Sequence, residues 1–225
     1  IGKGAFCECS SLVQFPIPDN VREISEGVFQ KCKSLNNVIF KENIISIGKD
    51  AFNGCESFTN IEIPETVQLV YSGAFSNCTS LIEMKIKSKL KKLPKNLLSG
   101  CRILPKIEIP KSVTTIGSSV FSGCECLESI EIPRLVRVIK KNVFKGCIQL
   151  KKVVFNEELT SIGSYSFSRC NSLIEIKLPP KLQMIEDHLF YLCDLLETVH
   201  IENEVKRICE CAFGGCKQLK NIIIP

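Results

Sequence analysis

The stretch that decides the fold is residues 104–124, L-P-K-I-E-I-P-K-S-V-T-T-I-G-S-S-V-F-S-G-C, because its pattern recurs along the whole chain. Its last residue, Cys124, belongs to a series of ten cysteines that stand 23 residues apart. A phenylalanine lies three positions before each of them, except at Leu98. A period this regular predicts stacked units, a solenoid, rather than a globule held by distant contacts. The series is Cys9, Cys32, Cys55, Cys78, Cys101, Cys124, Cys147, Cys170, Cys193 and Cys216.

The first half of each unit has the pattern of a short strand. Ile107 and Ile109 flank a polar residue, and this period-two alternation of β-branched residues predicts a strand with one buried face. Pro110 then ends the strand, because proline has no N–H to donate to the next strand. The same proline position is filled by Pro18, Pro64, Pro133, Pro179 and Pro225.

The second half of each unit has a second apolar pair, such as Val113 with Ile116. We interpret it as a shorter extended segment that brings the chain back across the convex side. The glycine that follows predicts a turn with positive φ, and the A-F-x-x-C stretch predicts one helical or 3₁₀ turn that places Phe and Cys in the core. All 13 phenylalanines occupy columns that we expect to be buried. The glycines in question are Gly2, Gly48, Gly117 and Gly163.

The unit L-x-x-I-x-I-P-x-x-V-x-x-I-G-x-x-A-F-x-x-C resembles the BspA-like class of leucine-rich repeat, and it recurs ten times in register. The resemblance implies a mostly β leucine-rich repeat solenoid in a right-handed arc. It also implies a concave parallel sheet, here of about ten short strands, opposite short convex strands and helical turns. It further implies roles in surface adhesion and protein binding, and it brings no catalytic residues to transfer.

We expect residues 1–225 to form a single leucine-rich repeat domain of 23-residue repeats, because no linker or break in charge divides the chain. Both ends fall inside the repeat: Ile1 occupies the column of Ile24, and Pro225 occupies the column of Pro18. The chain is therefore expected to be truncated at both ends. For that reason a missing signal peptide or membrane span says nothing about the longer protein.

The 14 cysteines do not predict a disulfide framework. Side chains stacked one strand apart sit near 4.8 Å, wider than the Cβ separation of about 3.8 Å that a disulfide prefers. We therefore expect the ladder thiols to be free, buried and packed as small apolar groups. Four cysteines lie off the ladder: Cys7, Cys126, Cys209 and Cys211.

No metal site or cofactor is predicted. Cys211 shares a column with His188, but two ligands are fewer than the four that structural zinc normally takes. Many free thiols favour a reducing, intracellular compartment, whereas the family resemblance allows the cell surface. The sequence leaves the localisation and the oligomeric state open.

The net charge is +5, and the chain has no tryptophan. Because the phenylalanines belong to the core, no aromatic platform remains for bases, and nucleic-acid binding is not expected. A run of lysines is either a solvated face on an irregular repeat or a contact for an anionic partner. The run comprises Lys85, Lys87, Lys89, Lys91, Lys92 and Lys95.

The sequence has no phosphate-binding loop, nucleophile elbow or H-E-x-x-H motif, so an enzyme is not predicted. Glu108 and Glu131 share an outward column on adjacent strands, near the separation of about 5 Å that retaining glycosidases use. Lys85 lies in the same column beside Glu108, however, and regular stacking produces such pairs without any catalytic role.

The outward positions of the concave sheet are the candidate binding residues: Glu62, Lys85, Glu108, Glu131, Lys152, Lys177 and His200. Mixed charges in a fixed grid suit a protein or peptide partner, unless these residues pair among themselves and only keep the sheet soluble. Three functions remain open. They are a non-enzymatic protein-interaction scaffold, a BspA-like cell-surface adhesin, and a targeting array for a catalytic domain outside this chain.

Overall fold

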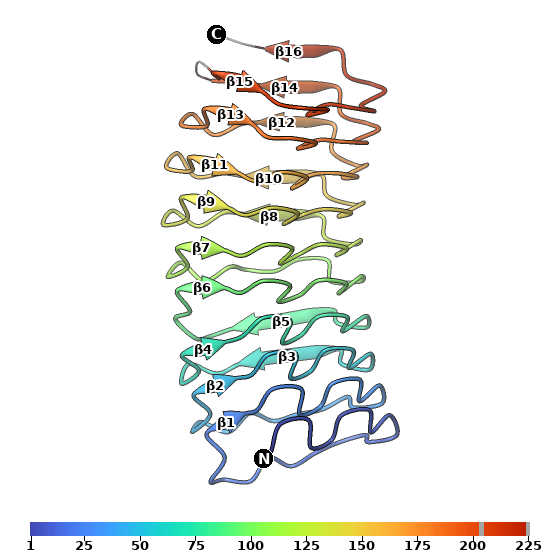
Figure 1. The fold of residues 1–225 in the computed structure, drawn as a ribbon, viewed down its shortest axis with the longest axis vertical. Coiled ribbons are helices and arrows are strands. Elements are labelled where there is room, and N and C mark those ends of the chain that lie inside the picture. The colour runs from blue at the N-terminus through green and yellow to red at the C-terminus, as the bar shows by residue number, and fades with distance from the viewer. Residues whose placement is uncertain (203–204, 224–225) are drawn as a thin grey trace.

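The computed structural model describes residues 1–202 and 205–223 and is a β-solenoid (Figure 1). All strand pairs are parallel, and each joins residues 23 positions apart, such as Ser129 with Lys152. The predicted stack of 23-residue coils is thereby confirmed. The predicted last strand runs into Ile224 and Pro225, which lie outside the described residues.

One side of the stack carries the longer strands, and we call it the long-strand face. In the described ranges it has seven strands of three or four residues, and these coincide with the predicted Ile-x-Ile pattern. Their bounds are β3 Asn60–Ile63, β5 Glu83–Ile86, β8 Ser129–Glu131, β10 Lys152–Val154, β12 Glu175–Lys177, β14 Thr198–His200 and β16 Asn221–Ile223.

The long-strand face is less continuous than the predicted sheet of about ten strands. Its strands form separate groups, β3–β5, β8–β10 and β12–β14–β16. The first two coils are joined on this side by a single bridge between Gln14 and Asn37. The segment that contains Ile107 and Ile109 buries both side chains but pairs with neither neighbour.

The opposite side, the short-strand face, consists of two-residue strands, and its longest sheet has the order β6–β7–β9–β11. These strands are the second extended segment expected in each unit. Their bounds are β1 Glu23–Ile24, β2 Ser46–Ile47, β4 Leu69–Val70, β6 Lys92–Leu93, β7 Thr115–Ile116, β9 Val138–Ile139, β11 Ser161–Ile162, β13 Met184–Ile185 and β15 Arg207–Ile208.

The A-F-x-x-C segments are chains of tight turns, and the predicted helical or 3₁₀ turns are not confirmed. In the second coil the Gln30 amide donates to the Gly27 carbonyl within the coil, whereas the Phe29 amide donates to Ala51 of the next coil. Gly27 and Lys31 both have φ near 60°, a conformation that no right-handed helix continues through. Half of the amides therefore bond between coils and half within them.

Every unit repeats this pair of left-handed residues, four positions apart. The position is easiest for glycine and next easiest for Asn and Asp. The first column is Gly4, Gly27, Asp50, Gly73, Asn96, Ser119, Asn142, Tyr165, His188 and Cys211, and the second is Glu8, Lys31, Gly54, Asn77, Gly100, Gly123, Gly146, Arg169, Leu192 and Gly215.

The glycines that follow the second extended segment are required for a different reason than the one predicted. Gly48, Gly117 and Gly163 are not in the left-handed region. A Cβ on Gly48 would lie 2.7 Å from the carbonyl oxygen of Ile24, because the backbone of the preceding coil passes against it. Close approach of neighbouring coils, and not a positive φ, excludes a side chain here. At Gly2 a Cβ would meet no atom within 4 Å.

The core is a ladder of phenylalanine rings that runs along the stack. Phe52 and Phe75 stack with centroids 5.4 Å apart and planes 2° apart, and Phe121 and Phe144 stack at 5.7 Å. Leu98 is fully buried in the same column and interrupts the ring stack between these two pairs. Burial of this column is confirmed for the inner coils. The partly buried phenylalanines are Phe6, Phe15, Phe40, Phe155 and Phe213.

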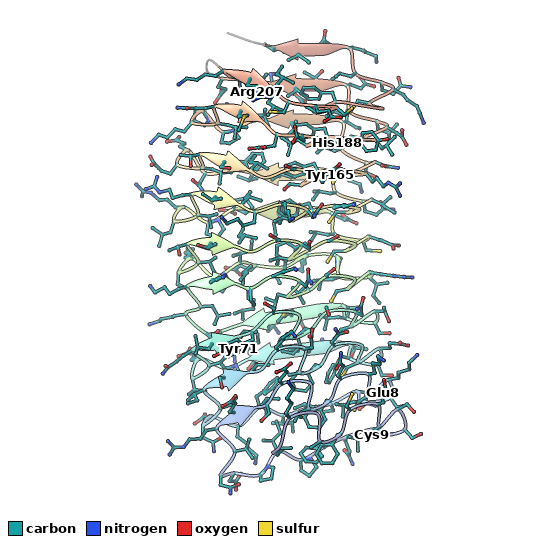
Figure 2. All side chains as sticks on the ribbon, in the orientation of Figure 1. Glu8, Cys9, Tyr71, Tyr165, His188 and Arg207 are labelled. Atoms are coloured by element: carbon teal, nitrogen blue, oxygen red, sulfur yellow. The ribbon has the colours of Figure 1, made fainter. Side chains whose placement is uncertain are left out.

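The cysteine ladder is buried as predicted from Cys32 to Cys193, and all 14 thiols are free. The thiols also form hydrogen bonds, which the sequence did not predict. Each donates its Sγ–H to the carbonyl of the anchor residue 26 positions earlier, as Cys124 does to Leu98 at 3.3 Å. Cys9, near the edge of the stack (Figure 2), is exposed, and Cys216 is half-buried, because each has a neighbouring coil on one side only.

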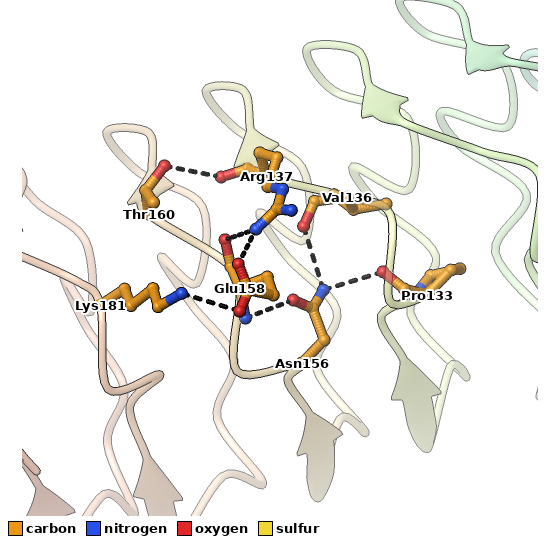
Figure 3. A network of polar contacts seen from close by, with 7 residues as sticks. All are labelled: Pro133, Val136, Arg137, Asn156, Glu158, Thr160 and Lys181. Atoms are coloured by element: carbon orange, nitrogen blue, oxygen red, sulfur yellow. Dashed lines mark hydrogen bonds and ion pairs between the residues drawn. The ribbon is translucent and has the colours of Figure 1, made fainter.

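One coil ends its long strand with Asn156 where other coils use proline (Figure 3). Its Nδ2 donates to the carbonyls of Pro133 at 2.8 Å and Val136 at 3.0 Å, and its Oδ1 accepts the amide of Glu158 at 2.8 Å. The side chain thus forms the turn and also ties it to the preceding coil.

Candidate binding face

The seven residues predicted to bind a partner all project from the long-strand face. Six are exposed, and His200 is half-buried. The strand register places Glu62 beside Lys85 on β3 and β5, and Lys177 beside His200 on β12 and β14. By repeat position six of them share one column, and Lys152 lies in the adjacent column beside Ser129. The seven residues do not share one environment.

At the N-terminal end of the face the charges are matched. Glu62 accepts from Lys87 at 2.7 Å, and Lys85 lies 3.1 Å from Glu83 in the same strand. Asn60 also donates to Glu83, at 2.9 Å. The hydrogen bond from Lys85 is the largest of the causes that lower the pKa of Glu83. These side chains satisfy one another across β3 and β5.

A second matched group lies at the C-terminal end. Lys177 contacts Glu202 at 2.5 Å, and His200 contacts Glu175. Exposed pairs of this kind contribute about 0–1 kcal/mol each and keep a sheet solvated. Lys152, on β10 between the two groups, is in no ion pair within the described part of the chain.

Glu108 and Glu131 differ from the other carboxylates in the column. In the part of the chain that the structure describes, neither is in an ion pair within 4 Å, and both are exposed. Glu131 ends β8, and Glu108 lies in the neighbouring unpaired segment. Two carboxylates without an ion-pair partner within 4 Å among the described residues therefore lie next to each other in the middle of the face.

A proline lies at the break before the unpaired segment. In a regular coil the amides of Ile82 and Glu83 both donate to the carbonyl of Thr59, which starts the next long strand. One coil later the position of Ile82 is filled by Pro105, which has no N–H. The carbonyl of Ile82 receives no backbone donor among the described residues, and the sheet opens between β5 and residues 106–109. The face also opens between β10 and β12, where the residue at the same position, Ile174, has an N–H, so a proline accounts for one of these breaks and not for all of them.

An open groove of about 760 Å³ lies at this interruption. It crosses the face obliquely, from Ile82 before β5 to Leu135 after β8, over a floor that includes Met84, Ile107 and Ile130. Of the predicted residues, Lys85, Glu108 and Glu131 line it, whereas Glu62, Lys152, Lys177 and His200 lie outside.

The sequence prediction missed the remaining polar and apolar lining of the groove. Lys106, Lys111 and Arg134 supply positive charge, and Ile82 and Leu135 are each 48% exposed. The one signal in the sequence was Pro105, the single proline in its column. Its effect on strand pairing is seen only in the structure, where Pro105 lies opposite the carbonyl of Ile82 and leaves it without a backbone donor among the described residues.

No metal-binding cluster accompanies the groove. Within residues 1–202 and 205–223, no group of three or more His, Cys, Asp or Glu side chains is arranged to hold a metal ion. In the same ranges there is no helix long and apolar enough to span a bilayer.

Parallel strands in 23-residue coils and buried Leu and Ile columns define the class of protein as a leucine-rich repeat solenoid. The family model for the BspA type leucine-rich repeat region, in six copies, matches residues 1–128 and 91–220. The chain belongs to this family, as its repeat unit indicated.

Solved structures of bacterial repeat proteins are similar to the chain. The leucine-rich repeat protein of T. pallidum is 29% identical with a TM-score of 0.66, over 72% of this chain and 78% of that one. A leucine-rich cell surface protein from Faecalibacterium prausnitzii is 25% identical with a TM-score of 0.51, over 99% and 82%.

The pneumococcal vaccine antigen PcpA shares the fold, at 24% identity and a TM-score of 0.62. The match covers 93% of this chain but 61% of PcpA. No curated protein matches the chain.

Proposed function

We propose that this chain is a non-enzymatic scaffold that binds a protein partner on its long-strand face, and that the groove at Pro105 is the centre of the contact. The observation that carries the proposal is the pair of unmatched carboxylates, Glu108 and Glu131, beside exposed apolar side chains. Elsewhere on the face most charges are already matched, so a partner would have to break existing ion pairs to bind there.

The groove suits an extended peptide segment with a basic residue for the two carboxylates and an acidic residue for Lys106, Lys111 and Arg134, which also line it. Ile82 and Leu135 lie at its two ends and offer apolar contacts, and the two carboxylates lie between them. Interfaces are strongest where a few apolar anchors are surrounded by matched polar groups. Because the strands hold these side chains in a fixed grid, less ordering entropy opposes binding.

The proposal is tested by panning a random peptide display library on the immobilised chain and measuring the affinity of the enriched peptides. We expect enrichment of Lys or Arg next to an apolar residue. The double variant Glu108→Lys with Glu131→Lys should weaken binding by about tenfold or more, which corresponds to about 1.4 kcal/mol, and should change its salt dependence.

A matched control is Glu23→Lys with Glu65→Lys, which makes the same charge change at exposed positions outside the groove. Affinity should be retained in this control, as it should after charge reversal at Arg137 and Lys206 on the opposite side. Equal losses in both double variants, or an affinity unchanged by the groove variant, would refute the groove as the binding site.

A second candidate is a cell-surface adhesin, which the likeness to a leucine-rich cell surface protein supports. This function and the scaffold function share the same binding face. Surface labelling of intact cells that make the full-length protein separates them, because an adhesin is accessible from outside the cell. A targeting array for a catalytic domain has no comparable support.

A further inference from the structure

The short-strand face has a sharply uneven charge. Residues 88–101, 111–124 and 134–147, which form the outer halves of three successive coils, hold ten lysines and arginines and no aspartate or glutamate. The corresponding residues 19–32 hold three acidic and two basic side chains. Stacking of these three coils therefore concentrates positive charge on one part of the surface.

The positive charge is carried by the longest sheet of this face, β6–β7–β9–β11, and by the turns that follow its strands. All of the residues concerned are exposed, and except for Arg137 none is in an ion pair within the described ranges. We call this set the basic face: Lys91, Lys92, Lys95, Arg137, Lys140, Lys141 and Lys145.

Among the described residues, one acidic group, Glu158, forms an ion pair with the basic face, and it is already shared. Glu158 accepts from Arg137 and, at 2.7 Å, from Lys181 (Figure 3). These two hydrogen bonds, first that from Lys181, lower the pKa of Glu158 to about 2, so it stays ionised and paired. The other six charges are left for an external partner.

The charges form two rows across a floor of short polar residues. Lys91 and Arg137 lie in one row, and Lys95 and Lys141 lie in the other. In each row the two side chains are two coils apart, which is about 9–10 Å at the usual strand spacing. Between and beside them are small hydroxyl side chains. Thr114, between Lys91 and Arg137, donates to the carbonyl of Lys91. Four others have no side-chain hydrogen bond among the described residues: Thr115, Ser118, Ser161 and Ser164.

We propose that the basic face binds a linear sulfated polysaccharide. Its lysines suit sulfate groups, because an ammonium group is a compact charge with donors that rotate freely. The free hydroxyls suit a hydroxyl-rich chain, and the regular rows suit a polymer with a repeating charge.

Three other anionic partners fit the basic face less well. Bases need an exposed aromatic ring, but the ring of Tyr165 lies under Lys145, 5.4 Å away, and stacks on His188 at 4.5 Å (Figure 2). Stable attachment to a membrane needs an apolar anchor as well as charge. The exposed apolar residues Leu69 and Tyr71 belong to the preceding coil, and Leu135 lines the groove of the long-strand face, so none of the three is part of the basic face. An acidic protein partner would likewise need apolar anchors in the patch.

The test uses immobilised heparin and the quadruple variant K91Q/K92Q/K140Q/K141Q. The control, K33Q/K49Q/K151Q/K217Q, removes the same formal charge from exposed lysines that are ion-paired elsewhere. We expect the basic-face variant to bind heparin at least about tenfold more weakly and with a shallower salt dependence. The control should keep most of its affinity, and thermal unfolding followed by circular dichroism verifies that both variants are folded.

Chemically desulfated heparin, phosphatidylserine vesicles and a single-stranded oligonucleotide are measured in parallel. Weak binding to all three supports the proposal. Equal loss in the two quadruple variants, undiminished binding of desulfated heparin, or no heparin binding at about 0.15 M salt overturns it. Tighter binding to vesicles or to the oligonucleotide than to heparin also overturns it and assigns the basic face to that partner.

Discussion

At the scale of single residues, the most consequential side chain is the ladder cysteine. It fills a small apolar space, and its Sγ–H also bonds the carbonyl of the preceding coil, at 2.9 Å from Cys32 to Phe6 and at 3.2 Å from Cys147 to Phe121. That carbonyl already accepts the amide of the cysteine in its own coil, so the thiol adds a second donor that links the coils.

Burial also makes the ladder thiols unreactive. It raises the pKa of the Cys32 thiol to about 11 and that of Cys170 well above its usual value. Because the thiolate is the reactive form, we expect labelling under native conditions to modify at most the six cysteines that are exposed or half-buried. Labelling followed by mass spectrometry measures this, and fast modification of Cys101 or Cys124 would contradict it. The six are Cys7, Cys9, Cys126, Cys209, Cys211 and Cys216.

The ring ladder gives a graded prediction for core substitutions. Phe121→Ala removes a fully buried ring that stacks on Phe144 and should lower the free energy of unfolding by about 3–5 kcal/mol. Leu98→Ala should cost less, because leucine is smaller and has no ring partner. Denaturant unfolding measures both values, and a larger loss at Leu98 would show that ring stacking adds little.

Glu158 gives a prediction for pH. Its pKa is lowered from 4.5 to about 2 by Lys181 and Arg137, so its contribution to folding is complete above pH 4.5 and is lost as the pH falls toward 2. Glu158→Gln should therefore be less stable than the wild type at neutral pH, and the difference should shrink through this window. Melting temperatures between pH 7 and pH 2 test this, and a constant difference would contradict it.

At the scale of elements, one proline marks the break in the long-strand face between β5 and β8. The irregular repeat that carries the lysine run, from Lys85 to Gly100, is well packed, because Leu97 and Leu98 are fully buried there. The backbone bonds between coils also continue through it, as from Phe75 to Leu97. The structure places the interruption in the following segment, residues 103–110.

Hydrogen exchange tests the position of this interruption. We expect the amides of residues 106–109 to exchange faster than those of β8, because this segment pairs with neither neighbouring strand, whereas β8 pairs with β10. Pro105→Ala restores a donor opposite the carbonyl of Ile82 and should slow exchange there. Faster exchange in residues 85–100 than in 106–109 would contradict this and would show that the irregular repeat is the weaker segment.

At the scale of the whole molecule, each coil pairs only with its neighbours, so stability is close to a sum over coils and their interfaces. Deleting residues 125–147 removes one complete unit and brings Phe121 against Phe167. The shortened chain should keep its circular dichroism spectrum with a lower unfolding midpoint. A deletion of half that length should unfold the chain, because it shifts every later column. Folding of both deletions to the same extent would contradict the stacking account.

The sequence alone determined the period, the long strands, the buried columns and the family. This was possible because each coil meets only its neighbours, so the residues that pack together are those at one repeat position. The same rule placed Glu62, Lys85, Glu108, Glu131, Lys152, Lys177 and His200 in outward positions.

Only the tertiary structure decided which of these charges remain unmatched. Pairing depends on how long side chains reach across adjacent coils: Glu62 reaches Lys87, whereas Glu108 reaches no cation among the described residues. The left-handed turns, the thiol hydrogen bonds and the groove likewise depend on contacts between neighbouring coils. At Pro105, for example, the carbonyl of Ile82 in the preceding coil meets no backbone donor among the described residues.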